Sequence, residues 1–416
     1  LAHLSIDDLI KTYLNEWSLN EIEPSTRFDG KHYEAIYQQG QTNAAPMLHF
    51  LKEGIYQGFN PWSEQTVITW QKPFIDHAEF ALSELNSNAG NWPKLQPTDE
   101  VHIHTHTQSH IVFHEFQNML VSAFKLLDIN AKASNETING KPQLRIIIAP
   151  HDFFYREPKV DVNLLSLSDT IIFNTEQVTS VWFGHCFQYL RQALGVMDIN
   201  LQTAVCLSQL GISTRFLPLG RIDGYPLFRN IIPIPTEIKS DLSGFDFSDQ
   251  SASNSDRPID LVWIGSNSKR RQAFLDIAQP TFDEFKSFIR LVNVRGALSS
   301  THNGAVSALS YAALGQRAKI LLNIHHFGIP YFEWQRLMHF GFMQGACVVT
   351  ETASAVPHLI PGEHYLQTDL NHIPELVKWL LQDAEGRQTL ESVGAKGYET
   401  AMQKFNLSFT LEKLFM

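Results

Sequence analysis

The chain has 416 residues, more than one ordinary hydrophobic core holds, so its length predicts two or three domains. Its apolar share of 44% is typical of globular proteins, and no uncharged apolar run approaches the roughly 20 residues of a spanning helix. The formal net charge of −11 argues against sequence-independent nucleic-acid binding, which needs many cations opposite the phosphates. Because no secretion signal opens the sequence, we expect a soluble, cytoplasmic protein.

Residues 1–98 are rich in aromatic residues and have the pattern of short helices separated by turns. Pro46 suits the first turn of a helix, and Gly58 suits a helix end. We therefore predict a helical accessory module. Its aromatic residues fit a buried core better than a peripheral membrane contact, although both interpretations stay open. The residues concerned are Trp17, Phe59 and Trp62.

Residues 99–240 alternate between strand and helix patterns. The predicted strands are 101–104, 144–149, 170–174 and 215–220, and the predicted helices are 113–127, 182–194 and 205–210. This alternation is typical of a parallel sheet covered by helices, so the segment is predicted to form one Rossmann-like lobe.

Residues 241–257 are rich in Ser and Asp, which favours a linker. The alternation then restarts in a second predicted lobe, 258–385, and residues 386–416 are predicted to be C-terminal helices. Within the second lobe we expect strands at 259–264, 319–324 and 346–350 and a helix over 331–343. The predicted fold class is thus α/β, with two Rossmann-like lobes facing each other across a cleft.

Polar residues stand at the ends of two predicted strands of the second lobe. Asn323 and His325 end one strand and Glu351 ends another, and ligands of open α/β sheets bind just outside such carboxyl ends. Glu333 and Arg336 are three residues apart and share one helix face near its start, where backbone N–H groups favour a diphosphate. Alone, the pair would be interpreted as a surface ion pair. Together with the strand ends it predicts a ligand site.

A second candidate site follows the first strand of this lobe. Gly265 and Ser266 form a small-residue turn, and Lys269 and Arg270 stand at the start of the next helix. Backbone N–H groups and cations in that arrangement suit a diphosphate, although the P-loop pattern is missing. A solvated basic first turn is the alternative interpretation.

Histidines gather at the end of the first predicted strand. His102, His104 and His106 alternate, which could indicate a metal, but no carboxylate or cysteine cluster completes a site and we expect none. We predict instead that His104 and His106, with His110, line the cleft, where one of the first two acts as general base for a hydroxyl. Glu176 is the reserve candidate. Histidines satisfied within a polar loop are the competing interpretation.

The stretch 321–362 resembles the nucleotide-sugar half of GT-B glycosyltransferases, in a bacterial branch with the pattern LNIH…E..R…VV(S/T)E…PG. The resemblance implies that Glu333 contacts ribose or sugar hydroxyls, that Arg336 is oriented to the donor, and that Glu351 lies at the loop facing the donor sugar. The remaining donor-binding candidates are Gly265, Ser266, Lys269, Arg270, Asn323 and His325.

The first half of the chain carries further resemblances to these enzymes. Residues 172–177 resemble their YNxEQ strand end, 196–200 their VWDYSxxN segment and 218–220 their PLGY. Residues 28–61 resemble a small helical module found beside bacterial polysaccharide glycosyltransferases, with the pattern FDxxYY…NPLxHYLxxGxxEGRxP.

One departure from the family pattern concerns stereochemistry. Retaining relatives carry two glutamates separated by seven residues, and the position that would hold the second one, counted from Glu333, is Gly341. Whether the reaction retains or inverts configuration therefore stays open.

The resemblance implies a glycosyltransferase that moves a sugar from a nucleotide-sugar to a hydroxyl of a glycan, lipid-linked or protein acceptor, in polysaccharide or glycoconjugate synthesis. It implies no metal and no cofactor besides the donor substrate. Two alternatives remain: a nucleotide-sugar epimerase on the same scaffold, and a non-catalytic scaffold that binds a glycan or a partner, which the missing second glutamate favours.

Overall fold

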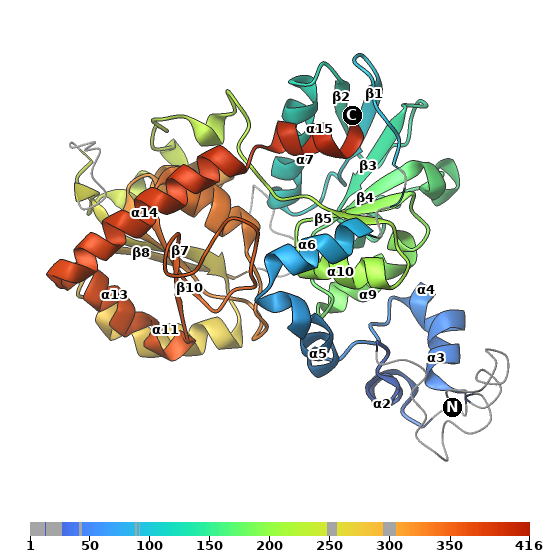
Figure 1. Cartoon of the computed structure of the whole chain (residues 1–416), viewed down its shortest axis with the longest axis horizontal. Helices are drawn as coiled ribbons and strands as arrows, with labels where there is room; N and C mark the ends of the chain where they lie inside the picture. The colour runs from blue at the N-terminus through green and yellow to red at the C-terminus, as the bar shows by residue number, and fades with distance from the viewer. Residues whose placement is uncertain are drawn as a thin grey trace.

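The computed structural model describes Tyr13 and residues 27–40, 44–87, 90, 92–247, 256–293 and 305–416. Two parallel sheets form its two lobes (Figure 1). The first has the strand order β2-β1-β3-β4-β5-β6 and the second the order β11-β10-β9-β7-β8. This confirms the predicted α/β class with two parallel-sheet lobes.

The first lobe alternates strands with helices, as its sequence pattern predicts. Its strands are β1 (Glu100–His104), β2 (Asn130–Ser134), β3 (Leu144–Ile148), β4 (Thr170–Asn174), β5 (Gly195–Asp198) and β6 (Thr214–Phe216). Its helices are α7 (Ile111–Lys125), α8 (Pro150–Phe153), α9 (Val181–Leu190) and α10 (Leu201–Gln209). Successive side chains of β4 point to opposite faces: Phe173 packs against Phe116 of α7, and Ile172 shares a cluster with Phe183 of α9.

The second lobe is built in the same way. Its strands are β7 (Ile259–Ser266), β8 (Ser287–Val292), β9 (Ala318–Asn323), β10 (Cys347–Glu351) and β11 (Leu366–Thr368). Its helices are α11 (Lys269–Phe282), α12 (Ala308–Gly315), α13 (Ile373–Gln382) and α14 (Ala384–Lys404). Trp263 of β7 shares a cluster with Phe274 of α11, and Val262 shares another with Tyr311 of α12, so helices cover both faces of the sheet.

The N-terminal helices pack beneath the first lobe (Figure 1). They comprise α2 (Gly30–Tyr33), π-helical turns at Glu34–Gln38 and Phe50–Gly54, α3 (Pro46–His49), α4 (Ile55–Gln57), α5 (Glu64–Ile75) and α6 (Ala78–Ser87). Trp62 is only 5% exposed because it packs against Phe183 and Phe187 of α9, and Phe59 stacks on Tyr37. Trp62 is thus a core residue and Phe59 is half-buried against the same cluster, whereas Trp17 lies outside the described residues. Within the described part of the chain, no helix is long and apolar enough to span a bilayer.

The C-terminal helices are divided between the lobes. Helix α14 covers the second lobe, and α15 (Leu407–Phe415) lies beside α7 of the first lobe (Figure 1). The chain crosses where Arg221 pairs with Phe405 and Leu407: Arg221 N donates to Phe405 O at 3.0 Å, and Leu407 N donates to Arg221 O at 2.9 Å. The predicted segment boundaries stay predictions, and residues 248–255 of the predicted linker lie outside the described residues.

One predicted helix differs in kind. The helix expected over 331–343 is a π-helix at Gln335–Gly341 followed by a 3-10 turn at Phe342–Gln344. π-Helical segments are rare and often occur at functional sites. Here the segment carries Arg336, and Glu333 lies two residues before its start.

Candidate active site

A cavity of about 520 Å³ lies between the two lobes. The first lobe contributes the start of α7 and the loop after β4, and the second contributes the end of β7 and residues 326–336. Both lobes therefore meet the cavity at the carboxyl ends of their strands, where open α/β sheets bind ligands. The volume falls within the range of small-molecule sites in proteins.

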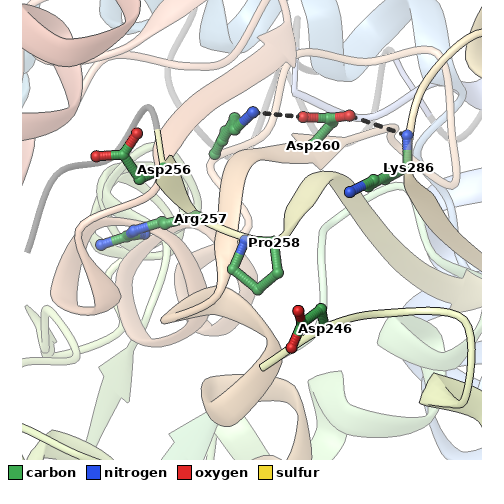
Figure 2. Close-up of a pocket in the computed structure, with 7 residues that line it drawn as sticks. Asp246, Asp256, Arg257, Pro258, Asp260 and Lys286 are labelled. Atoms are coloured by element: carbon green, nitrogen blue, oxygen red, sulfur yellow. Dashed lines mark hydrogen bonds and ion pairs between the residues drawn. The ribbon is translucent and has the colours of Figure 1, made fainter. Parts of the chain in front are cut away.

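A second cavity, of about 310 Å³, lies at the opposite edge of the second sheet, where β7 begins (Figure 2). Asp260 there accepts hydrogen bonds from Lys319 Nζ at 2.7 Å and from the backbone N of Lys286 at 2.9 Å. The guanidinium of Arg257 donates hydrogen bonds to the carbonyls of Gly315, Ala318 and Gln344. These groups thus hold the amino ends of strands and the ends of helices together, so we place the active site in the larger cavity.

Arg336 of the π-helix and Glu333, two residues before that helix begins, both lie on the cavity wall. Arg336 Nη1 donates to Asn323 Oδ1 at 2.7 Å and lies 3.5 Å from Glu333 Oε2. Asn323 is fully buried and donates to Thr350 Oγ1 at 3.0 Å, so it positions Arg336 and does not itself line the cavity. Arg336 Nε has no hydrogen-bond partner among the described residues. The Arg336 side chain is 13% exposed, and a cation with an unused donor at a cavity wall is suited to an anionic ligand.

Of the two arginines at the start of α11, the structure brings Arg271 rather than the predicted Arg270 to the cavity. Arg271 is 2% exposed, and it joins the ends of two strands by donating to Ile324 O at 2.7 and 3.0 Å and to Ser266 O at 3.0 Å. Burial lowers its pKa to about 10, which leaves it charged at neutral pH. The predicted residues Gly265 and Ser266 line the cavity beside it.

Three further predicted donor contacts form a support behind the cavity wall. Arg270 makes two hydrogen bonds to Glu351, at 2.8 and 2.5 Å, and Glu351 also accepts from the backbone N of His325. None of these residues lines the cavity, and the exposed Lys269 does not line it either. The side chains of Arg270 and Glu351 thus bind each other behind the cavity wall, and direct donor contact by these four residues stays a prediction.

His326, which the sequence analysis did not select, lines the cavity where His325 was expected. Its Nδ1 lies 3.5 Å from Ser266 Oγ. Burial lowers the pKa of His326, and the charges of Glu333 and Glu176 oppose that shift. The sequence signal for His326 was the His-His pair itself. Which of the two histidines faces the cavity depends on where the strand ends, and the sequence pattern does not fix that position.

The structure does not bring His104 or His106, the two predicted acceptor bases, to the cavity. Both are fully buried and neither lines the cavity. His104 donates from Nδ1 to the Asn135 carbonyl, and burial lowers its pKa to about 4. His106 has both ring nitrogens occupied, since Nδ1 accepts from Gln108 N and Nε2 donates to Pro158 O. In these positions neither ring borders the cavity, so the site gives the predicted base role no support.

His110 is the histidine of this group that does line the cavity. Its Nδ1 accepts from Val112 N at 3.2 Å and caps α7, so in the neutral ring the proton lies on Nε2. Burial lowers the pKa of His110 to about 4, which keeps the ring neutral at physiological pH. In this form His110 can donate a hydrogen bond to a ligand but cannot accept a proton at Nε2.

Glu176 is the predicted catalytic candidate that the structure does bring to the cavity. It follows β4, its side chain is 22% exposed, and its Oε1 lies 3.4 Å from Nε2 of the buried His151. Burial raises the pKa of Tyr331, and the charges of Glu333, Asp198 and Glu176 add to the shift. Since Tyr331 and His326 belong to the second lobe, Glu176 faces that lobe across the cavity.

No family model matches the chain, and no curated protein matches its sequence. Among solved structures, HepE of Anabaena, in complex with UDP and glucose, is 10% identical with a TM-score of 0.48, covering 76% of this chain and 98% of its own. An alpha1,3-fucosyltransferase with GDP-fucose is 8% identical with a TM-score of 0.38, covering 76% of this chain and 88% of its own.

Two parallel-sheet lobes whose strand ends face one cavity, with a C-terminal helix returning to the first lobe, define the architecture. The fold is GT-B. This fold hosts nucleotide-sugar-dependent glycosyltransferases, but a fold alone does not establish an activity, which has to be argued from the site.

Within this GT-B chain, packing explains the missing second glutamate. A Cβ atom at Gly341 would lie 2.5 Å from Val348 Cγ2 and 3.4 Å from Leu321 Cδ2. The position therefore faces the β9–β10 surface and not the cavity, so a glutamate there could not reach a donor. In the described residues, no group of three His, Cys, Asp or Glu side chains could hold a metal ion, and metal independence stays a prediction.

Proposed function

We propose that the chain is a glycosyltransferase that moves a sugar from a nucleotide-sugar to a hydroxyl acceptor. One observation carries the proposal: a carboxylate of the first lobe, Glu176, faces a carboxylate and a cation of the second lobe, Glu333 and Arg336, across a single cavity. Transfer needs these parts, namely a group for the acceptor proton, a contact for donor hydroxyls and a positive charge for the leaving diphosphate.

On the donor side, Arg336 would neutralise the diphosphate while the turn at Gly265 and Ser266 offers backbone N–H groups. Arg336 is held in place by Asn323, so little reorganisation is needed when charge develops on the leaving oxygen. Glu333 would accept hydrogen bonds from ribose or sugar hydroxyls, as the family resemblance implies.

On the acceptor side, Glu176 would take the proton of the attacking hydroxyl. In that step the acceptor oxygen forms a bond to the anomeric carbon, the bond from this carbon to the diphosphate breaks, and the nucleoside diphosphate leaves with the electron pair. His151 lies behind Glu176 and can orient its carboxylate. A direct displacement of this kind inverts the anomeric configuration.

The same pair of cavity carboxylates also favours the second candidate, a nucleotide-sugar epimerase, because epimerisation needs an acid and a base in the cleft. An epimerase converts its nucleotide-sugar without any acceptor. Proton NMR of the reaction with and without acceptors separates the two candidates. Only the transferase releases a nucleoside diphosphate in an amount that depends on the acceptor.

The first test is a thermal-shift panel of nucleoside diphosphates and nucleotide-sugars against the wild-type chain and Glu333→Gln. A ligand at one hundred times its dissociation constant should stabilise the protein by about 2.7 kcal/mol. We expect the nucleotides of one base to raise the melting temperature of the wild type. In Glu333→Gln the rise caused by the nucleotide-sugar should be smaller. If no nucleotide shifts the wild type, the proposal fails and the non-catalytic scaffold replaces it.

A further inference from the structure

The loop 175–180 carries Glu176 to the cavity, and it is held from the N-terminal helical module. Asn60 Nδ2 donates to the carbonyls of Val178 and Ser180, at 2.8 and 2.9 Å. Its Oδ1 accepts from Trp62 N at 3.0 Å. Asn60 is 5% exposed. Both N–H groups of its side-chain amide thus donate to this loop, which is distant in the sequence.

The near end of the loop is held from within the first lobe. Asn174 Nδ2 donates to Glu176 O at 2.9 Å and to Asp198 Oδ2 at 2.7 Å. Between the two anchors, Ser180 N donates to Gln177 O at 2.9 Å. The backbone on both sides of Glu176 is therefore fixed, on one side by its own lobe and on the other by Asn60.

The position of Asn60 is itself fixed against α9. A Cβ atom at Gly184 would collide with the carbonyl oxygen of Gly58, and one at Gly58 would collide with His185. Gly58 also has φ +76°, which favours glycine. Trp62, two residues after Asn60, lies with its ring centroid 5.0 Å from that of Phe187. The module cannot shift along α9 without breaking these close contacts.

The module also reaches the second lobe at this point. One narrow void of about 10 Å³ is lined by Val67 and Gln71 of α5, by Gln177 and Val178 of the loop, and by residues 329–331 of the second lobe. Nearby, the backbone N of Ala355 donates to Ile75 O at 2.6 Å. Module, catalytic loop and donor lobe therefore meet in one place.

We propose that the N-terminal helical module is part of the catalytic unit, with Asn60 as the positioning residue that sets the place of Glu176. The proposal rests on the proposed function for the role of Glu176. The module then contributes to catalysis by positioning Glu176, and is more than an appended helical segment.

The test compares Asn60→Asp with Ser63→Ala in the full chain. Asn60→Asp keeps the side-chain size but removes both donors and sets a carboxylate against two carbonyls. Ser63→Ala removes the N-cap of α5, where Ser63 Oγ bonds Thr66 N and Asp29, and so perturbs the same module without touching the loop. Hydrogen–deuterium exchange and steady-state kinetics are measured for both.

For Asn60→Asp we expect faster amide exchange over 176–183 and a kcat reduced about 10- to 100-fold, with the KM for the donor within about threefold, because displacement of a reacting group by an ångström costs such factors. For Ser63→Ala we expect faster exchange in α5 and a kcat within about threefold. Equal exchange and equal kcat in the two variants would overturn the proposal.

The two readouts separate this inference from the proposed function. A wild type without turnover on any acceptor defeats the proposed function, whereas the exchange of 176–183 still decides whether Asn60 holds the loop. If the wild type turns over but Asn60→Asp changes neither kcat nor the amide exchange of 176–183, only the positioning role of Asn60 is refuted.

Discussion

Arg336 offers the sharpest test of the donor side, through the substitution Arg336→Met. Methionine keeps an unbranched apolar stem but removes the charge that faces the cavity. A hydrogen bond to a charged group contributes about 1.5–3 kcal/mol, so affinity for a nucleoside diphosphate should fall about 10- to 150-fold. The substitution also leaves Asn323 Oδ1 without its 2.7 Å donor in a fully buried position, which should cost about 1–3 kcal/mol of stability.

A matched variant, Asn323→Ala, separates these two effects. It breaks the same 2.7 Å hydrogen bond but keeps the Arg336 charge, so stability should fall by a comparable amount while nucleotide affinity falls less. Isothermal titration with a nucleoside diphosphate measures the affinity, and urea unfolding measures the stability. Wild-type affinity in Arg336→Met would refute the assignment of this residue to the diphosphate, whatever its stability.

The remaining predictions concern the base, the pH dependence and the π-helix. Glu176→Gln should lower kcat at least 100-fold with little change in nucleotide affinity; an unchanged kcat measured with acceptor would eliminate it as the base. The pKa values of His104 and His110 are lowered to about 4, so the unfolded chain binds protons below pH 6.5 that the folded one does not. Unfolding free energy should therefore fall between pH 6.5 and 4, by up to about 3 kcal/mol for each; His110→Gln should flatten this slope in urea titrations, and an unaltered slope would contradict the burial argument. Gly341→Ala should destabilise the protein by about 1–3 kcal/mol, because the added Cβ would lie 2.5 Å from Val348 Cγ2. An unchanged melting temperature would show that the neighbouring side chains make room for it.

The amino-acid sequence by itself determined the architecture. Strand–helix alternation predicted two parallel-sheet lobes, because a buried strand and an amphipathic helix each leave a periodic apolar pattern. It also selected Glu333 and Arg336, since residues three apart on a helix lie on one face, and the structure places both on the cavity wall. Glu176 was likewise found at the end of a strand, where sheet geometry puts ligands.

Only the tertiary structure decided which neighbour of each pair faces the cavity. Arg271 and His326 line it while Arg270 and His325 do not. Neighbouring side chains point in different directions, both at the start of a helix such as α11 and just after a strand such as β9, so the exact start or end of the element decides which one faces the cavity. His104 was expected at the cleft, but at the end of β1 its ring is fully buried, bonded to the Asn135 carbonyl and packed against Phe153, whereas Glu100 and His102 earlier in the same strand are partly exposed. The hydrogen bond from Asn60 to the loop 175–180 joins residues more than one hundred positions apart, and local sequence patterns carry no signal for a contact at that distance.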